Sequence, residues 1–316
     1  MRSLFVMDPL DRIVVAGDST YVTMRECTDR GFPVWMCTPG QLYALNGRTR
    51  AAATPVRTTA TAPFFHTGPV EDCDLGDFDV VWMRKDPPFD MDYIFSTYLL
   101  DMAPEGTLVV NDPEGLKLFN EKMWVQRQWP ELQPPTLISN DKDRLAAFIA
   151  GRTEPTVLKP WDGNGGRGVV VTEAGDRNNR SLIELLTQEG RAYVIAQGYL
   201  HGVVDGDKRI LLFDGEPVGA MLRVPGDGDH RANMHVGATV SPCELDARDR
   251  AICDALAPQL KKWGMIFVGI DVIDGHLTEV NVTSPTGIRE MNRLYGLHLE
   301  GDLVDRVLAR VHGDSA

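Results

Sequence analysis

A glycine-rich segment between two runs of strand-forming residues limits the fold of this 316-residue chain more than any other feature. The segment reads Gly163-Asn-Gly-Gly-Arg-Gly168 and matches the pattern G-x-G-x-x-G. A dinucleotide-binding domain requires a helix directly after these glycines, because the helix N-terminus meets the pyrophosphate. Here Val169-Val-Val171 follows, and a β-branched run predicts a strand. The segment therefore indicates a strand–loop–strand hairpin and argues against a dinucleotide-binding fold.

A hairpin with this loop is suited to bind phosphate groups. Glycines allow backbone N–H groups to approach phosphate oxygens closely, and Lys159 adds a positive charge after the predicted strand at residues 156–158. Protein kinases use a similar loop, but their essential lysine follows it, and their H-R-D and D-F-G motifs are absent here. The Walker pattern is absent as well. The alternative interpretation is an exposed glycine-rich turn beside an incidental lysine.

The charge balance and the cysteines limit the environment and the partners. Asp and Glu number 45 against 32 Lys and Arg, which gives a net charge of −13 without any basic run. We therefore expect neither nucleic acid nor a membrane as a partner. The apolar run at residues 4–7 is too short for a signal peptide, and no stretch reaches the roughly 18 apolar residues of a membrane span. Five cysteines without a C-x-x-C pair fit free thiols in a reducing cytoplasm.

The first part of the chain, residues 1–121, predicts an α/β domain. Apolar runs predict strands at residues 4–7, 34–37, 80–83 and 108–111. Helices are expected at residues 19–31, with Ser19 or Thr20 as the N-cap, and at residues 91–102. Residues 46–69 lack periodicity and are expected to be irregular.

The second part, residues 122–316, predicts an α+β domain in which strands come in hairpins. Two hairpins turn at Asp-Gly pairs, namely residues 209–213 with 216–224 and residues 266–273 with 277–282. Helices are expected between and after them, at residues 141–150, 181–189, 246–263 and 303–311. We expect a cleft between the two parts.

Three oxygen-donor side chains interrupt the apolar pattern of the last hairpin. Asp271, Glu279 and Asn281 lie on strands in which polar side chains alternate with apolar ones, and such polar side chains are costly unless they are paired or bind a metal. Glu279 and Asn281 are two residues apart and share a face. Asp271 joins that face if the loop has three residues with Gly275 left-handed, but not if the loop is a two-residue Asp-Gly turn. We predict the three-residue loop and a Mg²⁺ site; the alternative is a half-exposed hairpin face.

A set of longer segments matches a known family over nearly the whole chain. They are Val6-Met-Asp-Pro9, Asp18-Ser-Thr20, Met83-Arg-Lys-Asp-Pro-Pro-Phe-Asp90, Asn120-Glu-Lys122, Leu158-Lys-Pro160, Asp205-Gly-Asp-Lys-Arg209, Phe267-Val-Gly-Ile-Asp271 and Thr278-Glu-Val-Asn-Val-Thr-Ser-Pro-Thr-Gly287. On these segments the chain resembles bacterial glutathione synthetase, an ATP-grasp ligase. The resemblance implies an N-terminal α/β domain and an ATP-grasp domain, with a lid at about residues 122–200 and a catalytic part at about residues 201–316.

The resemblance also implies the reaction. ATP would phosphorylate the C-terminal carboxylate of γ-glutamylcysteine, and the amine of glycine would attack the acyl phosphate. The products would be glutathione, ADP and phosphate. The implied cofactors are ATP and Mg²⁺, or Mn²⁺ in its place. The family also implies a homo-oligomer, to which the aromatic region at residues 93–100 could contribute an interface.

Site residues are implied position by position. The phosphates of ATP would meet Lys122, Lys159, Gly163, Asn164, Gly165, Gly166 and Gly168. Adenine and ribose would meet Gln197, Tyr199, Leu200 and Asp207. Asp271, Glu279 and Asn281 match the Mg²⁺ ligands. The substrates would meet Arg84, Arg209, Arg223, Asn281 and Ser284, with Arg209, Arg223 and Lys159 acting in catalysis.

One loop departs from the family pattern. Where the family usually reads E-T-R-G-N-L-A-A-G-G-R-G, this chain reads Asp229-His-Arg-Ala-Asn-Met-His-Val-Gly-Ala-Thr239. The change supports a second hypothesis, a ligase on the same scaffold that joins a different γ-glutamyl compound or a different amine. A third hypothesis is a nucleotide-binding regulator without catalysis, and the retained Lys122, Lys159 and Asp271 argue against it.

Overall fold

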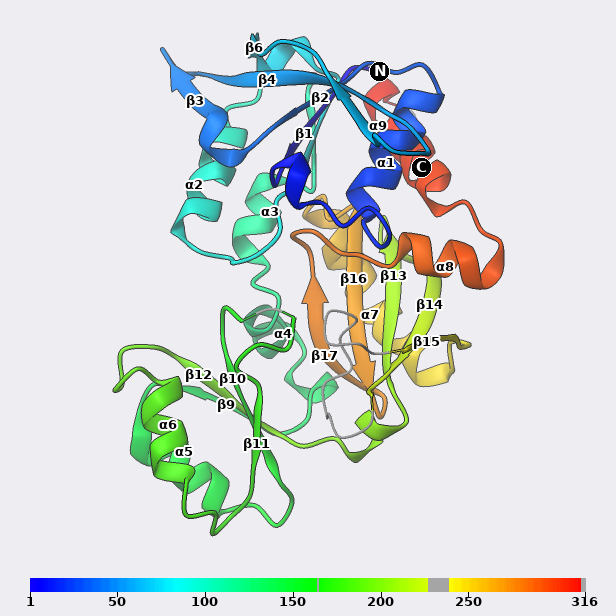
Figure 1. Cartoon of the computed structure of the whole chain (residues 1–316). Helices are drawn as coiled ribbons and strands as arrows, with labels where there is room; N and C mark the ends of the chain where they lie inside the picture. Colours follow the sequence, from blue (N-terminus) through cyan, green and yellow to red (C-terminus); the bar gives the residue numbers. More distant parts are fainter. Residues whose placement is uncertain (164, 227–238, 314–316) are drawn as a thin grey trace.

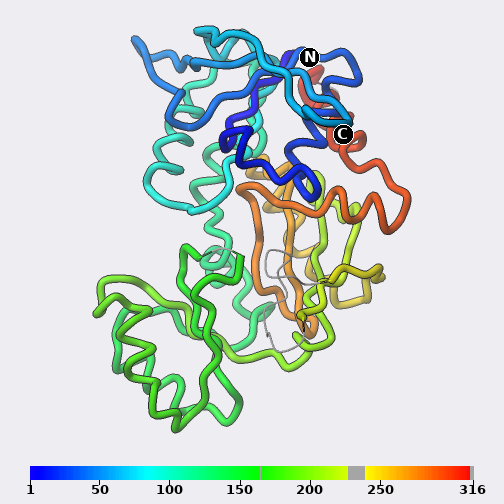
Figure 2. Tube along the Cα trace, in the orientation of Figure 1, coloured from blue at the N-terminus to red at the C-terminus, as the bar shows by residue number. Residues whose placement is uncertain are grey.

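In the described part of the chain, three sheets follow one another along the sequence (Figure 1). The computed structural model describes residues 1–163, 165–226 and 239–313. An eight-stranded sheet, a four-stranded sheet and a five-stranded sheet succeed one another. The four-stranded sheet forms a lobe of its own beside the other two (Figure 2). The predicted fold class, an α/β part followed by an α+β part with a central lobe, is confirmed.

Parallel strands form the centre of the N-terminal sheet. β1 (Ser3–Met7) pairs in parallel with β2 (Val34–Cys37) on one side and with β7 (Val80–Arg84) on the other, and β7 pairs with β8 (Leu108–Val110). All five residues of β1 are buried, as expected for a strand that is covered on both faces. The strands predicted in this part are therefore confirmed.

A long strand occupies the region that we expected to be irregular. β4 (Arg48–Thr58) pairs with β2 and with three short antiparallel strands, β3 (Leu42–Leu45), β5 (Phe65–Thr67) and β6 (Glu71–Asp74). Its inward positions include Ala51 and Ala53, which are fully buried. The prediction is wrong because it relied on large apolar residues to identify strands. The buried positions of this strand are occupied by alanine, which is only weakly hydrophobic.

Aspartates cap the first two helices of the N-terminal part. α1 (Ser19–Asp29) is capped by Asp18, whose carboxylate accepts a hydrogen bond from the Tyr21 N–H at 2.5 Å. The prediction of Ser19 or Thr20 as the cap is therefore wrong, since both lie inside the helix. α2 (Met91–Leu100) begins where predicted, and Asp90 caps it in the same way. A side-chain oxygen that satisfies a free N–H of the first turn is the usual reason for such starts.

The central lobe is an antiparallel sheet with two helices. Its strand order is β11-β10-β12-β9, and its elements are β9 (Thr136–Ser139), α5 (Lys142–Ala150), β10 (Thr156–Pro160), β11 (Val170–Thr172), α6 (Asn179–Leu186) and β12 (Val194–Gly198). The lobe has a small core of its own, centred on Leu145, Leu158 and Ile183. The hairpin predicted on both sides of the glycine loop is confirmed by the antiparallel pairing of β10 with β11.

The C-terminal sheet has the strand order β15-β14-β13-β16-β17. Its elements are β13 (Asp207–Phe213), β14 (Glu216–Val224), β15 (Thr239–Pro242), α7 (Ala247–Lys262), β16 (Phe267–Ile273) and β17 (His276–Asn281). Both predicted hairpins are present, because β13 pairs with β14 and β16 pairs with β17. Asp214 and Gly215 both have positive φ angles, of 52° and 77°, as a two-residue turn of this type requires.

Short elements connect the sheets, and the last helix returns to the N-terminal part. The remaining helices are α3 (Pro113–Leu118), α4 (Met123–Gln128), α8 (Ile288–Tyr295) and α9 (Leu299–His312), with 3-10 turns at Leu10–Arg12, Pro39–Gln41, Leu75–Asp77, Pro130–Leu132 and His201–Val204. α9 packs against α1 (Figure 1), and one buried apolar cluster extends from β1 to the five-stranded sheet. None of the helices in the described part is long and apolar enough to cross a membrane.

Candidate functional site

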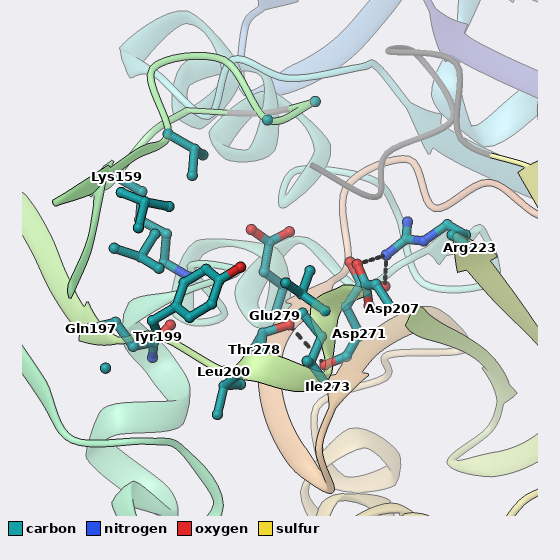
Figure 3. Close-up of a pocket in the computed structure, with 17 residues that line it drawn as sticks. Lys159, Gln197, Tyr199, Leu200, Asp207, Arg223, Asp271, Ile273, Thr278 and Glu279 are labelled. Atoms are coloured by element: carbon teal, nitrogen blue, oxygen red, sulfur yellow. Dashed lines mark hydrogen bonds and ion pairs between the residues drawn. The ribbon is translucent and has the colours of Figure 1, made fainter. Parts of the chain in front are cut away.

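A cavity lies between the central lobe and the five-stranded sheet. Its empty volume is about 860 Å³, part of it open to solvent. The predicted site residues that line it are Lys159, Gly165, Gly166, Gln197, Tyr199, Leu200, Asp207, Arg223, Asp271 and Glu279. In Figure 3, Lys159 and Tyr199 lie on the lobe side, and Asp207, Asp271 and Arg223 lie on the side of the sheet. The fold thus brings together residues that are far apart in sequence.

The glycine loop forms one wall of this cavity. Gly165, Gly166 and Gly168 have positive φ angles of 61°, 76° and 72°, which residues with a side chain rarely adopt. At Gly168 a Cβ atom would also lie 2.9 Å from Cγ of Pro160. The loop therefore needs glycine for its shape, and the shape leaves the backbone accessible to a phosphate. Asn164 lies outside the described residues.

Two lysines flank the loop. Lys159, on β10, is 8% exposed, and burial lowers its pKa to about 8. Lys122, which precedes α4, donates from Nζ to the Gly163 carbonyl at 2.6 Å and pairs with Glu279 at 3.4 Å. Burial acts to lower the pKa of Lys122, but the carboxylates of Glu279 and Glu121 outweigh it and leave the pKa raised. Lys122 thus ties the loop to the C-terminal hairpin.

Four charged side chains, three of them buried, form a network on the five-stranded sheet. Arg209 donates from Nε and Nη2 to the two carboxylate oxygens of Asp271, at 2.5 and 3.0 Å. Arg223 pairs with Asp271 at 3.0 Å and donates to Asp207 (Figure 3). Burial raises the pKa of Asp207. Asp271 is more deeply buried, but its two arginines outweigh that effect and lower its pKa. At neutral pH the network therefore presents an anionic Asp271 between two guanidinium groups.

The metal-ligand hairpin has a different turn from the predicted one. Asp274 and Gly275 both have positive φ angles, 50° and 66°, and Ile273 pairs with His276. The turn therefore has two residues, and the prediction of a three-residue loop is wrong. Asp271 still pairs with Glu279, because the register shifts by one residue beyond Val272. The predicted common face is thus present for another reason.

Asp271, Glu279 and Asn281 could hold a divalent cation. They offer carboxylate and amide oxygens on one face of the hairpin, and the Asn281 amide lies 3.2 Å from Oδ2 of Asp271. Within the described ranges, no group of three or more His, Cys, Asp or Glu side chains is arranged for a metal. A cation at this place would therefore take most of its shell from phosphate oxygens and water, which is how Mg²⁺ is usually bound.

Of the five predicted substrate residues, Arg223 lines the cavity, whereas Arg84, Arg209, Asn281 and Ser284 do not. Arg84 is buried; its Nε donates to Oγ1 of Thr20 at 3.0 Å and its Nη2 to the Pro285 carbonyl at 2.8 Å. Its guanidinium also lies 4.7 Å from the centre of the Phe267 ring. Ser284, next to Pro285, is half-buried. Arg84 thus holds the loop that carries Ser284 against the N-terminal sheet.

Two polar residues at or beside the site, Thr278 and Glu121, were not predicted. Thr278 lines the cavity between Asp271 and Glu279. Glu121 is buried; its carboxylate accepts a hydrogen bond from Oγ1 of Thr283 at 2.8 Å, and its carbonyl accepts one from the Val280 N–H at 2.9 Å. A signal for Thr278 exists in the sequence, because Leu277 is out of phase with the apolar alternation of the residues that follow it.

The chain matches known proteins over nearly its whole length. Family models described as prokaryotic glutathione synthetase match the chain, the N-terminal domain over residues 1–117 and the ATP-grasp domain over residues 121–296. The glutathione synthetase of Prochlorococcus marinus (strain MIT 9313) is 44% identical over 309 residues, 98% of this chain and 99% of that protein. That of Pseudomonas syringae pv. tomato (strain ATCC BAA-871 / DC3000) is 42% identical over 310 residues, 97% of each.

Solved structures share the fold. D-cycloserine synthetase DcsG superposes with a TM-score of 0.67 at 16% identity, over 98% of this chain and 99% of that one. The RimK domain protein ATP-grasp from Sphaerobacter thermophilus DSM 20745 gives a TM-score of 0.64 at 17% identity, over 98% and 100%. At such identities the likeness shows the architecture alone.

Proposed function

Because the chain belongs to the prokaryotic glutathione synthetase family, we propose that it joins γ-glutamylcysteine to glycine with the energy of ATP. The observation that carries the proposal is the cavity in which the glycine loop and Lys159 face Asp271 and Glu279. A phosphate-binding loop opposite oxygen ligands for a divalent cation is the arrangement that phosphoryl transfer requires. The products are glutathione, ADP and phosphate.

We propose the following roles at the nucleotide. Lys122, Lys159 and the loop residues Gly163, Asn164, Gly165, Gly166 and Gly168 bind the phosphates. Gln197, Tyr199 and Leu200 meet the adenine, and Asp207 meets the ribose. Asp271, Glu279 and Asn281 would hold Mg²⁺ or Mn²⁺. Such an ion would neutralise negative charge on the transferred phosphoryl group. These assignments are supported by the cavity lining, which includes Lys159, Gly165, Gly166, Gln197, Tyr199, Leu200, Asp207, Asp271 and Glu279.

The chemistry follows in two steps. A carboxylate oxygen of the dipeptide attacks the γ-phosphorus of ATP, and ADP leaves. The amine nitrogen of glycine then attacks the acyl carbon, phosphate leaves, and the nitrogen loses its proton. Arg209, Arg223 and Lys159 place positive charge where negative charge develops, and Arg84, Asn281 and Ser284 position the substrates. Both arginines are buried against Asp271, so they are held in place before the reaction.

We propose that the chain divides into a substrate domain at residues 1–121 and an ATP-grasp domain at residues 122–316, in which the central lobe acts as the lid. Closure of a lid would exclude water from the acyl phosphate until the amine attacks. The five free cysteines, four of them buried, support a reducing compartment such as the cytoplasm. The altered loop at residues 229–239 lies, except for Thr239, outside the described residues.

An ADP-release assay with γ-glutamylcysteine and a panel of amino acids tests the function. We expect turnover that depends on glycine and on Mg²⁺. Turnover with a different amine would favour the second hypothesis, and no turnover with any pair would favour a regulator. Replacing Glu279→Gln should weaken the apparent Mg²⁺ affinity about tenfold or more, whereas the exposed Glu105→Gln should leave it unchanged.

We also propose that the protein forms a homo-oligomer through α2. Within the predicted region at residues 93–100, Tyr93 and Leu100 are buried, but Phe95 and Tyr98 are 60% and 50% exposed. Met91 and Met102 extend this exposed apolar stripe at helical spacing, and such a stripe marks an interaction site.

Light scattering after gel filtration tests the oligomer. Phe95→Glu should lower the measured mass to that of a smaller assembly or the monomer, whereas Leu185→Glu, at a 73% exposed position of the central lobe, should not change it. An unchanged mass in the Phe95 variant would exclude α2 as the interface.

A further inference from the structure

Thr278 is an extra residue in the hairpin that carries Asp271 and Glu279. Val272 pairs with Leu277, and the next pair along β16 is Asp271 with Glu279. Thr278 is therefore left over in the register and forms a β-bulge. Bulges of this kind turn the side chains that follow them and occur often beside active sites.

The bulge allows β17 to contribute side chains both to the core and to the cavity. Leu277 and Val280 are three residues apart, yet both are buried, at 0% and 1% exposure. In an uninterrupted strand, residues three apart face opposite sides. The extra residue lets both side chains enter the core and places Glu279 on the cavity side, opposite Asp271. Without it, the two-residue turn would put Asp271 and Glu279 on different faces.

The side chain of Thr278 closes the bulge. Its Oγ1 donates a hydrogen bond to the Asp271 carbonyl at 3.0 Å, and the residue lines the same cavity as Asp271 and Glu279 (Figure 3). This bond crosses from β17 to β16 at the place where the regular ladder is interrupted. It therefore fixes the backbone of Asp271 relative to Glu279, while Arg209 and Lys122 hold the two carboxylates from outside the hairpin.

We propose that Thr278 is a positioning residue for the divalent cation: its hydroxyl sets the separation of Asp271 and Glu279. The inference rests on the proposed function, because it takes these two carboxylates as cation ligands. Residues that orient ligands without touching the metal commonly account for about 10–100-fold of its affinity. A hydroxyl that holds the ligand backbone belongs to this class.

Calorimetric titration of ADP, with Mg²⁺ and separately with EDTA, tests the role without any turnover. Thr278→Val keeps the β-branched shape and removes the hydroxyl. We expect it to weaken ADP binding in Mg²⁺ about tenfold and to leave binding in EDTA unchanged. Thr278→Ser keeps the hydroxyl and should restore most of the affinity in Mg²⁺.

Thr156→Val is the matched control, because Oγ1 of Thr156 is buried and has no hydrogen-bond partner in the described part of the chain. It should bind ADP like the wild type under both conditions. Equal binding by wild type and Thr278→Val would overturn the inference. So would an equal loss in Mg²⁺ and in EDTA, or a Ser variant as weak as the Val variant. If the wild type binds ADP equally well in Mg²⁺ and in EDTA, that result would instead contradict the proposed function.

Discussion

Lys159 carries a buried ammonium group. Its charge lowers the stability of the folded protein when no phosphate is bound beside it. Burial lowers its pKa to about 8 from 10.5. Between these two values the unfolded chain binds more protons than the folded one, so the stability of the folded protein rises with pH there. Below pH 8 both states are protonated and the full cost of the buried charge is present. A bound phosphate would favour the ammonium form and raise the pKa again.

Lys159→Met should therefore stabilise the free protein at pH 7 while it impairs nucleotide binding. The shift corresponds to a stabilisation of up to about 3 kcal/mol at pH 7, which should shrink as the pH approaches 10. Thermal unfolding at both pH values, without nucleotide, measures the difference. ADP affinity at pH 7 should fall at least about tenfold. A variant that is less stable than the wild type at both pH values would contradict the argument.

The glycine loop is an element whose function depends on its backbone conformation. Gly168 has a φ of +72° and lies against Pro160, whereas Gly175 has a φ of +92° and no atom within 4 Å of the place that a Cβ would occupy. An alanine at either position is strained by its positive φ, at a cost of about 1–2 kcal/mol. Only at Gly168 must the loop also move away from Pro160.

Gly168→Ala should therefore weaken ATP binding about tenfold, which is equivalent to about 1.4 kcal/mol. Gly175→Ala should lower the unfolding temperature, because its positive φ strains an alanine as well, and should leave ATP affinity unchanged. Calorimetric titration and thermal unfolding of both variants separate the two effects. Equal ATP affinities in the two variants would show that the shape of the loop at Gly168 does not matter for binding.

The elements also show where local sequence patterns suffice and where they fail. The hairpin after Lys159 was predictable, because Val169 to Val171 favour a strand wherever the segment is placed. β4 was not, because Ala51 and Ala53 are buried only through their neighbours in the sheet. The Asp274-Gly275 pair favours a two-residue turn, and the structure has one. The three-residue loop that we predicted in order to bring Asp271 and Glu279 to one face is absent, and the bulge at Thr278 brings them there instead.

The N-terminal and C-terminal sheets are joined through Asn111. This residue follows β8, and its side-chain amide donates to the carbonyls of Phe267 and Val282, each at 2.8 Å. Its Oδ1 accepts a hydrogen bond from the Phe267 N–H at 2.8 Å. Three buried hydrogen bonds from one side chain thus fix the start of β16 and the end of β17 against the N-terminal sheet.

Asn111→Ala should destabilise the whole protein, because it leaves three buried backbone groups without their partner. At about 1–3 kcal/mol for each unsatisfied group, partly relieved by water, we expect a loss of about 3–5 kcal/mol. Asn140→Ala, which removes a single bond to the Gly190 carbonyl, should cost about 1 kcal/mol. Urea unfolding measures both. A cost for Asn111→Ala no larger than that for Asn140→Ala would exclude this junction as a major source of stability.

Local sequence patterns account for the types of the main elements, for the glycine hairpin and for which residues suit a phosphate or a metal ion. These follow from neighbouring residues, since side-chain branching, glycine and alternation act over a few positions. Which of these residues lie close together depends on the three-dimensional packing of the chain. In the folded protein Lys159 lies opposite Glu279, and Arg84 does not line the cavity. The bulge at Thr278 turns Asp271 and Glu279 to one face. Such outcomes depend on the packing of Leu277 and Val280 into a core whose other residues are distant in sequence, so no local pattern contains them.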